Sequence, residues 1–341
     1  MTDNSPGTTS LINTAIAEEK ASRGGFSGFL KRSVQQSLAF GTLIVLVAFF
    51  AIASPNFFNW ANISGILLAT AVVGILALGT TFVIITGGID LSIGTGMTLC
   101  SVMTGVFITN MGLPIWIGVI GGILTGALMG LVNGTGVAIL GLPPFIATLA
   151  MMMIAQGLAL VISGVAPIYF SGTPGFRKIA LGEVIPSLPN AVLIMLVVAL
   201  VAYLILSKTI MGRFTFAIGS NEEATRLSGI NTRRWKILIY VLAGAVTGIA
   251  GVVMASRLDS AQPQLGMGYE LQAIAAVIIG GTSLLGGRGS IIGTLIGALI
   301  MAVLLNGLRI LSVQTEWQTV ATGVVILIAV FVDSLRNKRT G

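Results

Sequence analysis

The stretch VIITGGIDLSIGTG, from Val83 to Gly96, places a single carboxylate among glycines and between two apolar runs. Removing a charged carboxylate from water is costly unless it is paired or hydrogen-bonded, so Asp90 needs a partner there. Its oxygens can accept hydrogen bonds from the hydroxyl groups of a solute. They can also cap a following helix through the backbone N–H groups of Ser92 or Ile93. The two roles can coexist, and the residues alone leave both open.

Glycines on both sides of Asp90 interrupt helical continuity, because glycine costs about 1 kcal/mol relative to alanine inside a helix. Broken backbone at membrane depth is tolerated only where protein buries it or where it lines a water-filled cavity. Unwound segments of this kind bind substrate in many transporters. We therefore expect a polar surface that holds a solute weakly, formed by Thr86, Gly87, Gly88, Asp90 and Ser92.

Three other residues are candidates for the same solute pathway. Phe145 follows Pro143 and Pro144 at the start of an apolar run, where its ring could stack on a solute or pack against a neighbouring helix. Asn133 and Gln272 lie within or beside apolar runs. The ordinary role of such amides is a hydrogen bond between helices, and a place in the pathway is the alternative.

Several kinds of site are missing from the sequence. It has no histidine and one cysteine, Cys100, so we expect no zinc, haem or iron–sulfur centre and no bound cofactor. No G-x-x-x-x-G-K-[ST] stretch occurs, so ATP binding of that type is not expected. No Ser–Lys dyad or acidic metal cluster supports an integral-membrane enzyme.

The composition indicates a protein that crosses a membrane many times. Of its 341 residues, 55% are hydrophobic and 9% are charged, against about 25% charged in soluble proteins. Windows of about 20 apolar residues predict membrane-spanning helices. We expect ten, at roughly 38–54, 62–86, 92–109, 115–132, 144–163, 190–206, 236–255, 270–281, 290–308 and 317–332.

The basic residues predict the orientation of these spans, because cytoplasmic loops are enriched in Lys and Arg. With both termini in the cytoplasm, only four of the basic residues fall on the outer side: Arg177, Lys178, Arg257 and Arg309. The net charge of +7 is then a topology signal, and no nucleic-acid partner is expected. This arrangement predicts a mostly disordered cytoplasmic tail at 1–37, a membrane domain at 38–333 and a short cytoplasmic tail at 334–341.

The long charged loop at 207–236 contains the signals of a short helix. Asn221 is a good N-cap, and Glu222 and Glu223 favour the first turn. Arg226 stands four residues after Glu222, where side chains on a helix meet. Gly229 can end the helix in a left-handed conformation. We expect a short polar helix that projects from the membrane.

The stretch GSNEEATRLSGIN in this loop resembles the one that permease subunits of ATP-binding-cassette importers insert into a cleft of their ATPase. The chain as a whole is similar to the ribose/xylose/galactose-type monosaccharide permeases from about Leu38 to Asp333. TTFVIITGGIDLSIGTGM, LPPFIATLAMM and VIIGGTSLLGGRGSIIGTLIGALI carry this resemblance, in the same order. The family's docking pattern begins Glu-Ala-Ala, whereas here Glu223 and Ala224 are followed by Thr225.

The resemblance implies an all-α membrane protein with the importer permease fold and broken or re-entrant segments near 86–96 and 280–290. It also implies the bacterial cytoplasmic membrane, a second permease, identical or not, two cytoplasmic ATPases and an external sugar-binding protein. Residues matched to the docking loop are Asn221, Glu222, Glu223, Ala224, Arg226 and Gly229. The expected function is monosaccharide import without catalysis by this chain.

Two alternatives remain besides the enzyme. The cargo can be a non-sugar polar solute carried by the same class of importer. The chain can also be an ion-driven carrier that works alone, although such carriers usually keep ionisable groups at mid-membrane. Only Asp90 lies well away from the tails and the longer loops, with Glu270 and Glu316 at span ends.

Overall fold

The computed structural model describes residues 39–338. The expected tail at 1–37 lies outside the described residues, and the tail at 334–341 is described only to Lys338, as part of the last helix. The elements are a helix over Ala39–Ala53, α2 Trp60–Ile85, α3 Ile93–Gly105, the π-helix η1 Val106–Asn110, α4 Ile115–Ala138, α5 Pro144–Ser163, β1 Ile168–Tyr169, α6 Lys178–Leu181, α7 Asn190–Lys208, α8 Ile210–Ser220, α9 Glu222–Leu227, α10 Thr232–Leu258, β2 Ser260–Ala261, α11 Tyr269–Ile279, α12 Ile291–Ile310 and α13 Thr315–Lys338.

Among the described residues, eight helices are long and apolar enough to cross a membrane. They are α2, α3 with η1, α4, α5, α7, α10, α12 and α13, and each coincides with an expected span. The other two expected spans, 38–54 and 270–281, appear as shorter apolar helices over Ala39–Ala53 and Tyr269–Ile279. The all-α membrane fold is therefore as the composition predicts.

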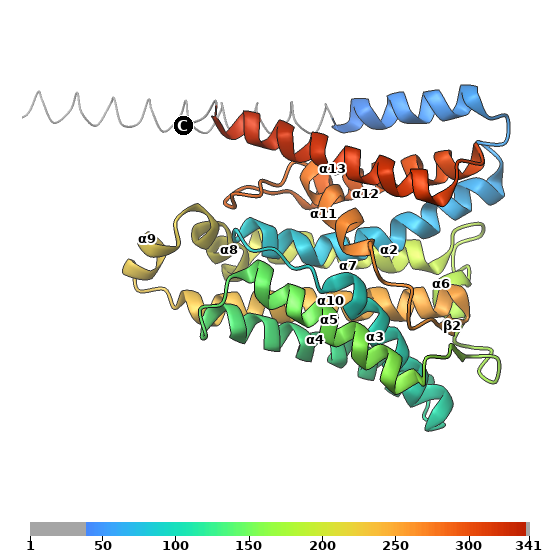
Figure 1. Ribbon diagram of the computed structural model, residues 1–341, viewed down its shortest axis with the longest axis horizontal. Helices are drawn as coiled ribbons and strands as arrows, with labels where there is room; N and C mark the ends of the chain where they lie inside the picture. The colour runs from blue at the N-terminus through green and yellow to red at the C-terminus, as the bar shows by residue number, and fades with distance from the viewer. Residues whose placement is uncertain (1–38, 339–341) are drawn as a thin grey trace, which may run out of the picture.

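The centre of the bundle is built on α2, with α10 beside it. In the most apolar part of α2, 89% of the residues are buried, against 6% in α13, which lies at the edge of the molecule (Figure 1). Small residues allow helices to approach closely in a membrane. Between α4 and α10, a side chain on Gly126 would collide with the Gly244 carbonyl oxygen.

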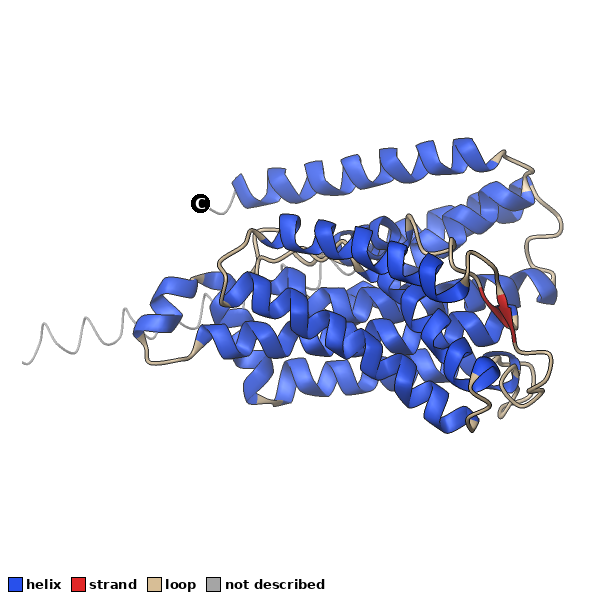
Figure 2. Ribbon diagram, turned by 60° about the horizontal axis from the view of Figure 1, so that its bottom comes forward, coloured by secondary structure: helices blue, strands red, loops and turns tan. Residues whose placement is uncertain are grey.

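The polar elements lie at two opposite ends of the bundle. Helices α8 and α9 form one end, and the antiparallel pair of β1 and β2 lies at the other with α6 (Figures 1 and 2). Ile168 faces Ala261 across this strand pair.

Three irregular segments interrupt the helices inside the bundle. Two of them, 86–92 and 280–290, correspond to the breaks expected near 86–96 and 280–290. The first break is shorter than expected, because α3 begins at Ile93 and includes Gly94 and Gly96. The third, 262–268, was not expected. It runs from β2 back along α3, because Ala261 lies beside Gly105 at one end of that helix and Gly266 lies against Gly94 at the other.

Candidate functional site

The first broken segment, 86–92, turns the chain from α2 into α3. Helix α2 ends at Ile85, and Gly87 takes a φ of +77°, a left-handed conformation that glycine adopts without strain. The N–H of Gly87 donates to the Ile84 carbonyl at 2.9 Å and that of Gly88 donates to the Val83 carbonyl at 3.1 Å. The last carbonyls of α2 are thus paired, as a helix end inside a bundle requires.

The Asp90 carboxylate organises the start of α3. Its Oδ1 accepts the backbone N–H of Ser92 at 2.9 Å and the Ser92 hydroxyl at 2.6 Å. The side-chain amide of Asn133, from α4, donates to Ser92 Oγ at 2.9 Å. Three predicted site residues therefore form one hydrogen-bonded chain that fastens the break to a neighbouring helix.

The three residues of this hydrogen-bonded network are closed to solvent. Asp90 is 1% exposed, Ser92 is 0% exposed and Asn133 is 2% exposed. The bond to the Ser92 N–H is the one that the capping role predicted, but it forms a turn that ends at Ser92, the N-cap residue of α3, and α3 has no side-chain cap bond of its own. The observed partners of Asp90 are thus local, and the Asn133 bond is one between helices.

Thr86, Gly87 and Gly88 line a cavity of about 250 Å³. The other lining residues are Val137, Pro144, Glu222, Lys236 and Tyr240. Because Glu222 begins α9, this cavity lies at the end of the bundle from which α8 and α9 project, rather than halfway along it. It is called the inner cavity below. The hydroxyl of Tyr240 is buried and has no hydrogen-bond partner among the described residues.

The predicted short helix in the loop is present as α9. Asn221 caps it by accepting the N–H of Ala224 at 2.9 Å, and Gly229 follows with a φ of +83°. The expected pairing of Glu222 with Arg226 is not the one found, because Glu222 bonds Lys236 at 2.6 Å instead. The turn after α9 brings the first residues of α10 back to Glu222, so the ion pair joins two elements rather than one.

The end of α8 contacts the last residue of α2 and the broken segment 280–290. Gly219 lies against the Ile85 carbonyl oxygen and the backbone nitrogen of Gly287, and a side chain at 219 would collide with that oxygen. The N–H of Gly287 in turn donates to the Ile85 carbonyl at 2.8 Å. The loop that carries α9 is therefore in direct backbone contact with the end of α2, just before the 86–92 segment, and with the 280–290 segment.

Two predicted pathway residues lie apart from the Asp90 network and from the inner cavity. Phe145, in the first turn of α5, is 49% exposed, and Gln272 is half-buried in the first turn of α11. Neither lines the inner cavity.

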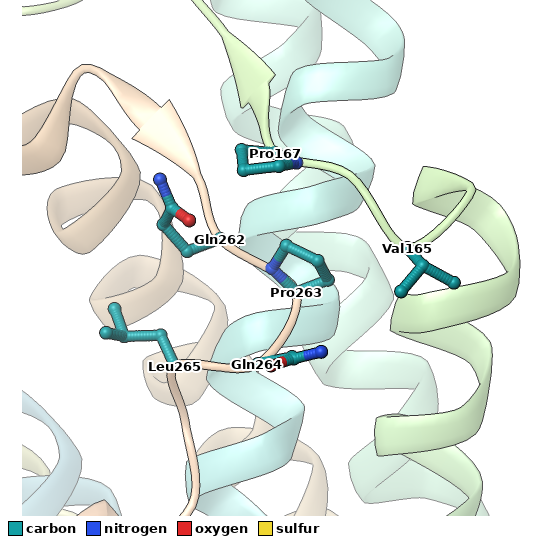
Figure 3. A pocket seen from close by; sticks show the side chains of 6 residues that line it. All are labelled: Val165, Pro167, Gln262, Pro263, Gln264 and Leu265. Atoms are coloured by element: carbon teal, nitrogen blue, oxygen red, sulfur yellow. The ribbon is translucent and has the colours of Figure 1, made fainter.

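A second cavity, of about 340 Å³, lies near the β1–β2 end and was missed by the sequence reasoning. It is lined by Val165, Pro167, Gln262, Pro263, Gln264 and Leu265 (Figure 3). The signal in the sequence was the run Gln262-Pro263-Gln264, two amides around a proline just after a span. Hydropathy assigned this run to an external loop, which hid its place inside the bundle.

Comparison with known proteins agrees with the features above. Residues 62–330 match the family described as branched-chain amino acid transport system / permease component. The ribose import permease protein RbsC of Escherichia coli (strain K12) is 42% identical over 312 residues, which is 91% of this chain and 97% of the relative. The RbsC protein of Bacillus subtilis (strain 168) is 44% identical, covering 86% and 91%. The fructose import permease protein FrcC of Rhizobium meliloti is 39% identical, covering 87% and 84%.

A solved structure, PsaBC from Streptococcus pneumoniae in complex with Fab, has a TM-score of 0.46 and 19% identity, covering 85% of this chain and 94% of that one. This likeness is too remote to bear on function. The expected resemblance to monosaccharide import permeases is confirmed by the curated relatives. With a family match over most of its length, the chain belongs to this family of membrane permease components.

Proposed function

We propose that the chain is the membrane subunit of an ATP-binding-cassette importer that moves a monosaccharide across the bacterial cytoplasmic membrane. The observation that carries this proposal is the identity of 39–44% with relatives named as ribose and fructose import permeases, over at least 86% of this chain. A neutral cargo also suits the interior, because the buried carboxylate of Asp90 is already occupied by Ser92.

The partners are those that the resemblance to import permeases implies. ATP hydrolysis belongs to two separate cytoplasmic subunits, in keeping with a sequence that has no Walker A stretch. A second permease, the same or a related chain, and an external sugar-binding protein complete the assembly. Helix α9 is the ATPase contact, because it projects at one end of the bundle with Glu222, Glu223 and Arg226 exposed.

The contacts of the α8–α9 loop suggest how the ATPase acts on the cargo route. A displacement of α9 would reach the inner cavity through the Glu222–Lys236 ion pair. It would also reach the end of α2 and the 280–290 segment through Gly219. Thr86, Gly87 and Gly88 are then the groups that meet the sugar at the cytoplasmic exit, while Asp90, Ser92 and Asn133 hold the break in shape.

The orientation places α8 and α9 in the cytoplasm and the β1–β2 end outside. The excess of Lys and Arg in the segments on the α9 side supports this arrangement. Both termini are then cytoplasmic.

The second candidate cargo is a non-sugar polar solute, and the family's description names branched-chain amino acids. A direct test is uptake by proteoliposomes that contain the permease, its ATPase and its binding protein, offered ribose, fructose, allose or leucine in turn. We expect uptake of one of the three sugars that requires ATP and the ATPase. Uptake of leucine alone would support the second candidate, and uptake by the permease alone, abolished by an uncoupler, would establish an ion-driven carrier instead.

A further inference from the structure

The outer cavity at the β1–β2 end has the size and chemistry of a binding site. Its volume of about 340 Å³ is in the range of small-molecule pockets, roughly 300–1,000 Å³. Figure 3 shows it between the segment 262–265 and the chain that follows α5, with the side chain of Gln264 extending toward the side where Val165 lies. Gln264 is exposed, so its amide is available to a solute.

The segment that carries Gln264 is fixed to α5 by a hydrogen bond in which Gln156 Nε2 donates to the Pro263 carbonyl at 3.2 Å. Local bonds order the segment on either side of Gln264. Both carboxylate oxygens of Glu270, which is 7% exposed, accept the N–H of Gly268, at 2.9 and 3.1 Å. Gln262 Nε2 donates to Ser260 Oγ at 2.9 Å. A preformed wall lowers the ordering cost of binding.

The lining suits an uncharged, hydroxyl-rich solute. None of the six lining residues carries a charge, so neither the carboxylate nor the ammonium of an amino acid would find an ionic partner among them. The amides of Gln262 and Gln264 supply donors and acceptors together, as a sugar hydroxyl requires. Val165, Leu265 and the two prolines supply apolar surface for the C–H face of a ring.

Two buried polar atoms flank the same segment without a partner. They are Gln156 Oε1 and Thr98 Oγ1, and neither has a hydrogen-bond partner among the described residues. Gly266 lies directly against Thr98 Oγ1, and the amide of Gln156 already bonds Pro263. Such atoms mark places where an ordered water is accommodated, and here they lie beside the segment 262–268 rather than in the lining of the cavity.

Polar contacts along α5 connect the outer cavity with the inner one. Thr148 Oγ1 donates to the Ile89 carbonyl at 3.3 Å, and one turn later Thr95 Oγ1 donates to the Met152 carbonyl at 3.0 Å. The Gln156–Pro263 bond follows after one more turn. Pro144, the first residue of α5, lines the inner cavity, and Val165, just beyond its last turn, lines the outer one.

We propose that the outer cavity is a binding site for the sugar on its way into the bundle, with the side-chain amide of Gln264 as the group that bonds its hydroxyls. This inference rests on the proposed function, since it concerns the route of that cargo. It assigns to the segment 262–268 a direct role in transport that its position after a span did not predict.

The test uses the complete importer in proteoliposomes and the sugar that the wild type transports. Gln264→Leu removes the amide but keeps the size, so uptake should fall by about 2- to 10-fold, the range that one neutral hydrogen bond supplies. ATP hydrolysis stimulated by the loaded binding protein should persist. Gln314→Leu is the matched control, because Gln314 is also exposed but lies between α12 and α13, outside the lining. Equal uptake by Gln264→Leu and Gln314→Leu would overturn the proposal.

A second measurement does not depend on turnover. Gln264→Cys introduces an exposed thiol into a chain whose native cysteine, Cys100, is buried. The transported sugar should slow the reaction of this thiol with a maleimide in the solubilised importer, and leucine should not. Labelling unaffected by the sugar would argue against the site even if the wild type imports that sugar. Failure of the wild type to import any sugar would count against the proposed function instead.

Discussion

At the scale of single residues, Asp90 can be tested by a change that removes its charge but keeps its shape. Asparagine retains an oxygen that can accept both the N–H and the hydroxyl of Ser92, and it caps helices about as well as aspartate. We therefore expect Asp90→Asn to assemble normally and to lose less than about twofold in uptake, because the observed bonds of Asp90 go to Ser92 and asparagine can still accept them. The measurement is sugar uptake at matched permease level and ATPase assembly. A larger loss would assign the carboxylate to the sugar.

Asp90→Ala is the companion variant. It leaves the backbone N–H and hydroxyl of Ser92, both buried, without their acceptor, which costs about 1–3 kcal/mol for an unsatisfied group. We expect a lower thermal midpoint for Asp90→Ala than for Asp90→Asn in detergent. Equal midpoints would show that the bonds from Ser92 to Asp90 contribute little to stability.

The sequence identified Asp90 and named both of its possible roles, including the N–H of Ser92 as a partner. It could not choose between them, because the choice depends on burial. The burial is set by residues distant in sequence, such as Asn133 in α4, which reaches Ser92 across the helix interface. The same holds for Gln264, whose importance depends on the folding of its segment toward Gly94.

At the scale of elements, α9 as the ATPase contact predicts the effect of a charge reversal. Glu223→Lys places a cation at the N-terminus of the helix and near Arg226, which is unfavourable for both reasons. The permease should remain folded while its co-purification with the ATPase falls. Glu316→Lys is the control, because Glu316 is also in a first helical turn but belongs to α13. Wild-type co-purification and transport by Glu223→Lys would contradict the role of α9.

The ion pair between Glu222 and Lys236 makes a separate prediction. Because both side chains retain some exposure, the pair is worth about 0–1 kcal/mol, and Glu222→Lys should lower the stability of the fold little. If the pair transmits movement to the inner cavity, uptake should fall by up to about fivefold. The exchange Glu222→Lys with Lys236→Glu should restore much of it. A double variant no better than the single one would exclude this pair from coupling.

Hydropathy located the helices well, since each expected span coincides with a helix. It failed for the segment 262–268, because its depth in the bundle is fixed by close backbone contact of Gly266 with Gly94 rather than by apolar character. The expected span 62–86 ended where α2 ends, so Thr86–Gly88 lie at the end of a span, as hydropathy predicted. The contact of Ile85 with Gly287 and Gly219 shows that α2 extends to the α8–α9 end before it breaks.

At the scale of the whole molecule, the two cavities lie toward opposite ends of the bundle, and α5 extends from one to the other. The inner cavity is bounded by α9, the element proposed to contact the ATPase, and the outer one lies beside the β1–β2 end. This arrangement suits a route that an external binding protein fills and an internal ATPase empties. It requires α9 and the strand pair to be on opposite sides of the membrane.

That requirement can be tested by labelling single cysteines in intact cells. Val184 is 78% exposed beyond α6, and Ser228 is exposed just after α9, so Val184→Cys and Ser228→Cys report on the two ends. The wild type is the control for background, because its cysteine, Cys100, is buried. We expect a maleimide that cannot cross the cytoplasmic membrane to label Val184→Cys in spheroplasts, and Ser228→Cys only after the membrane is opened. Labelling of Ser228→Cys alone in sealed spheroplasts would invert the orientation, and α9 could then no longer reach a cytoplasmic ATPase.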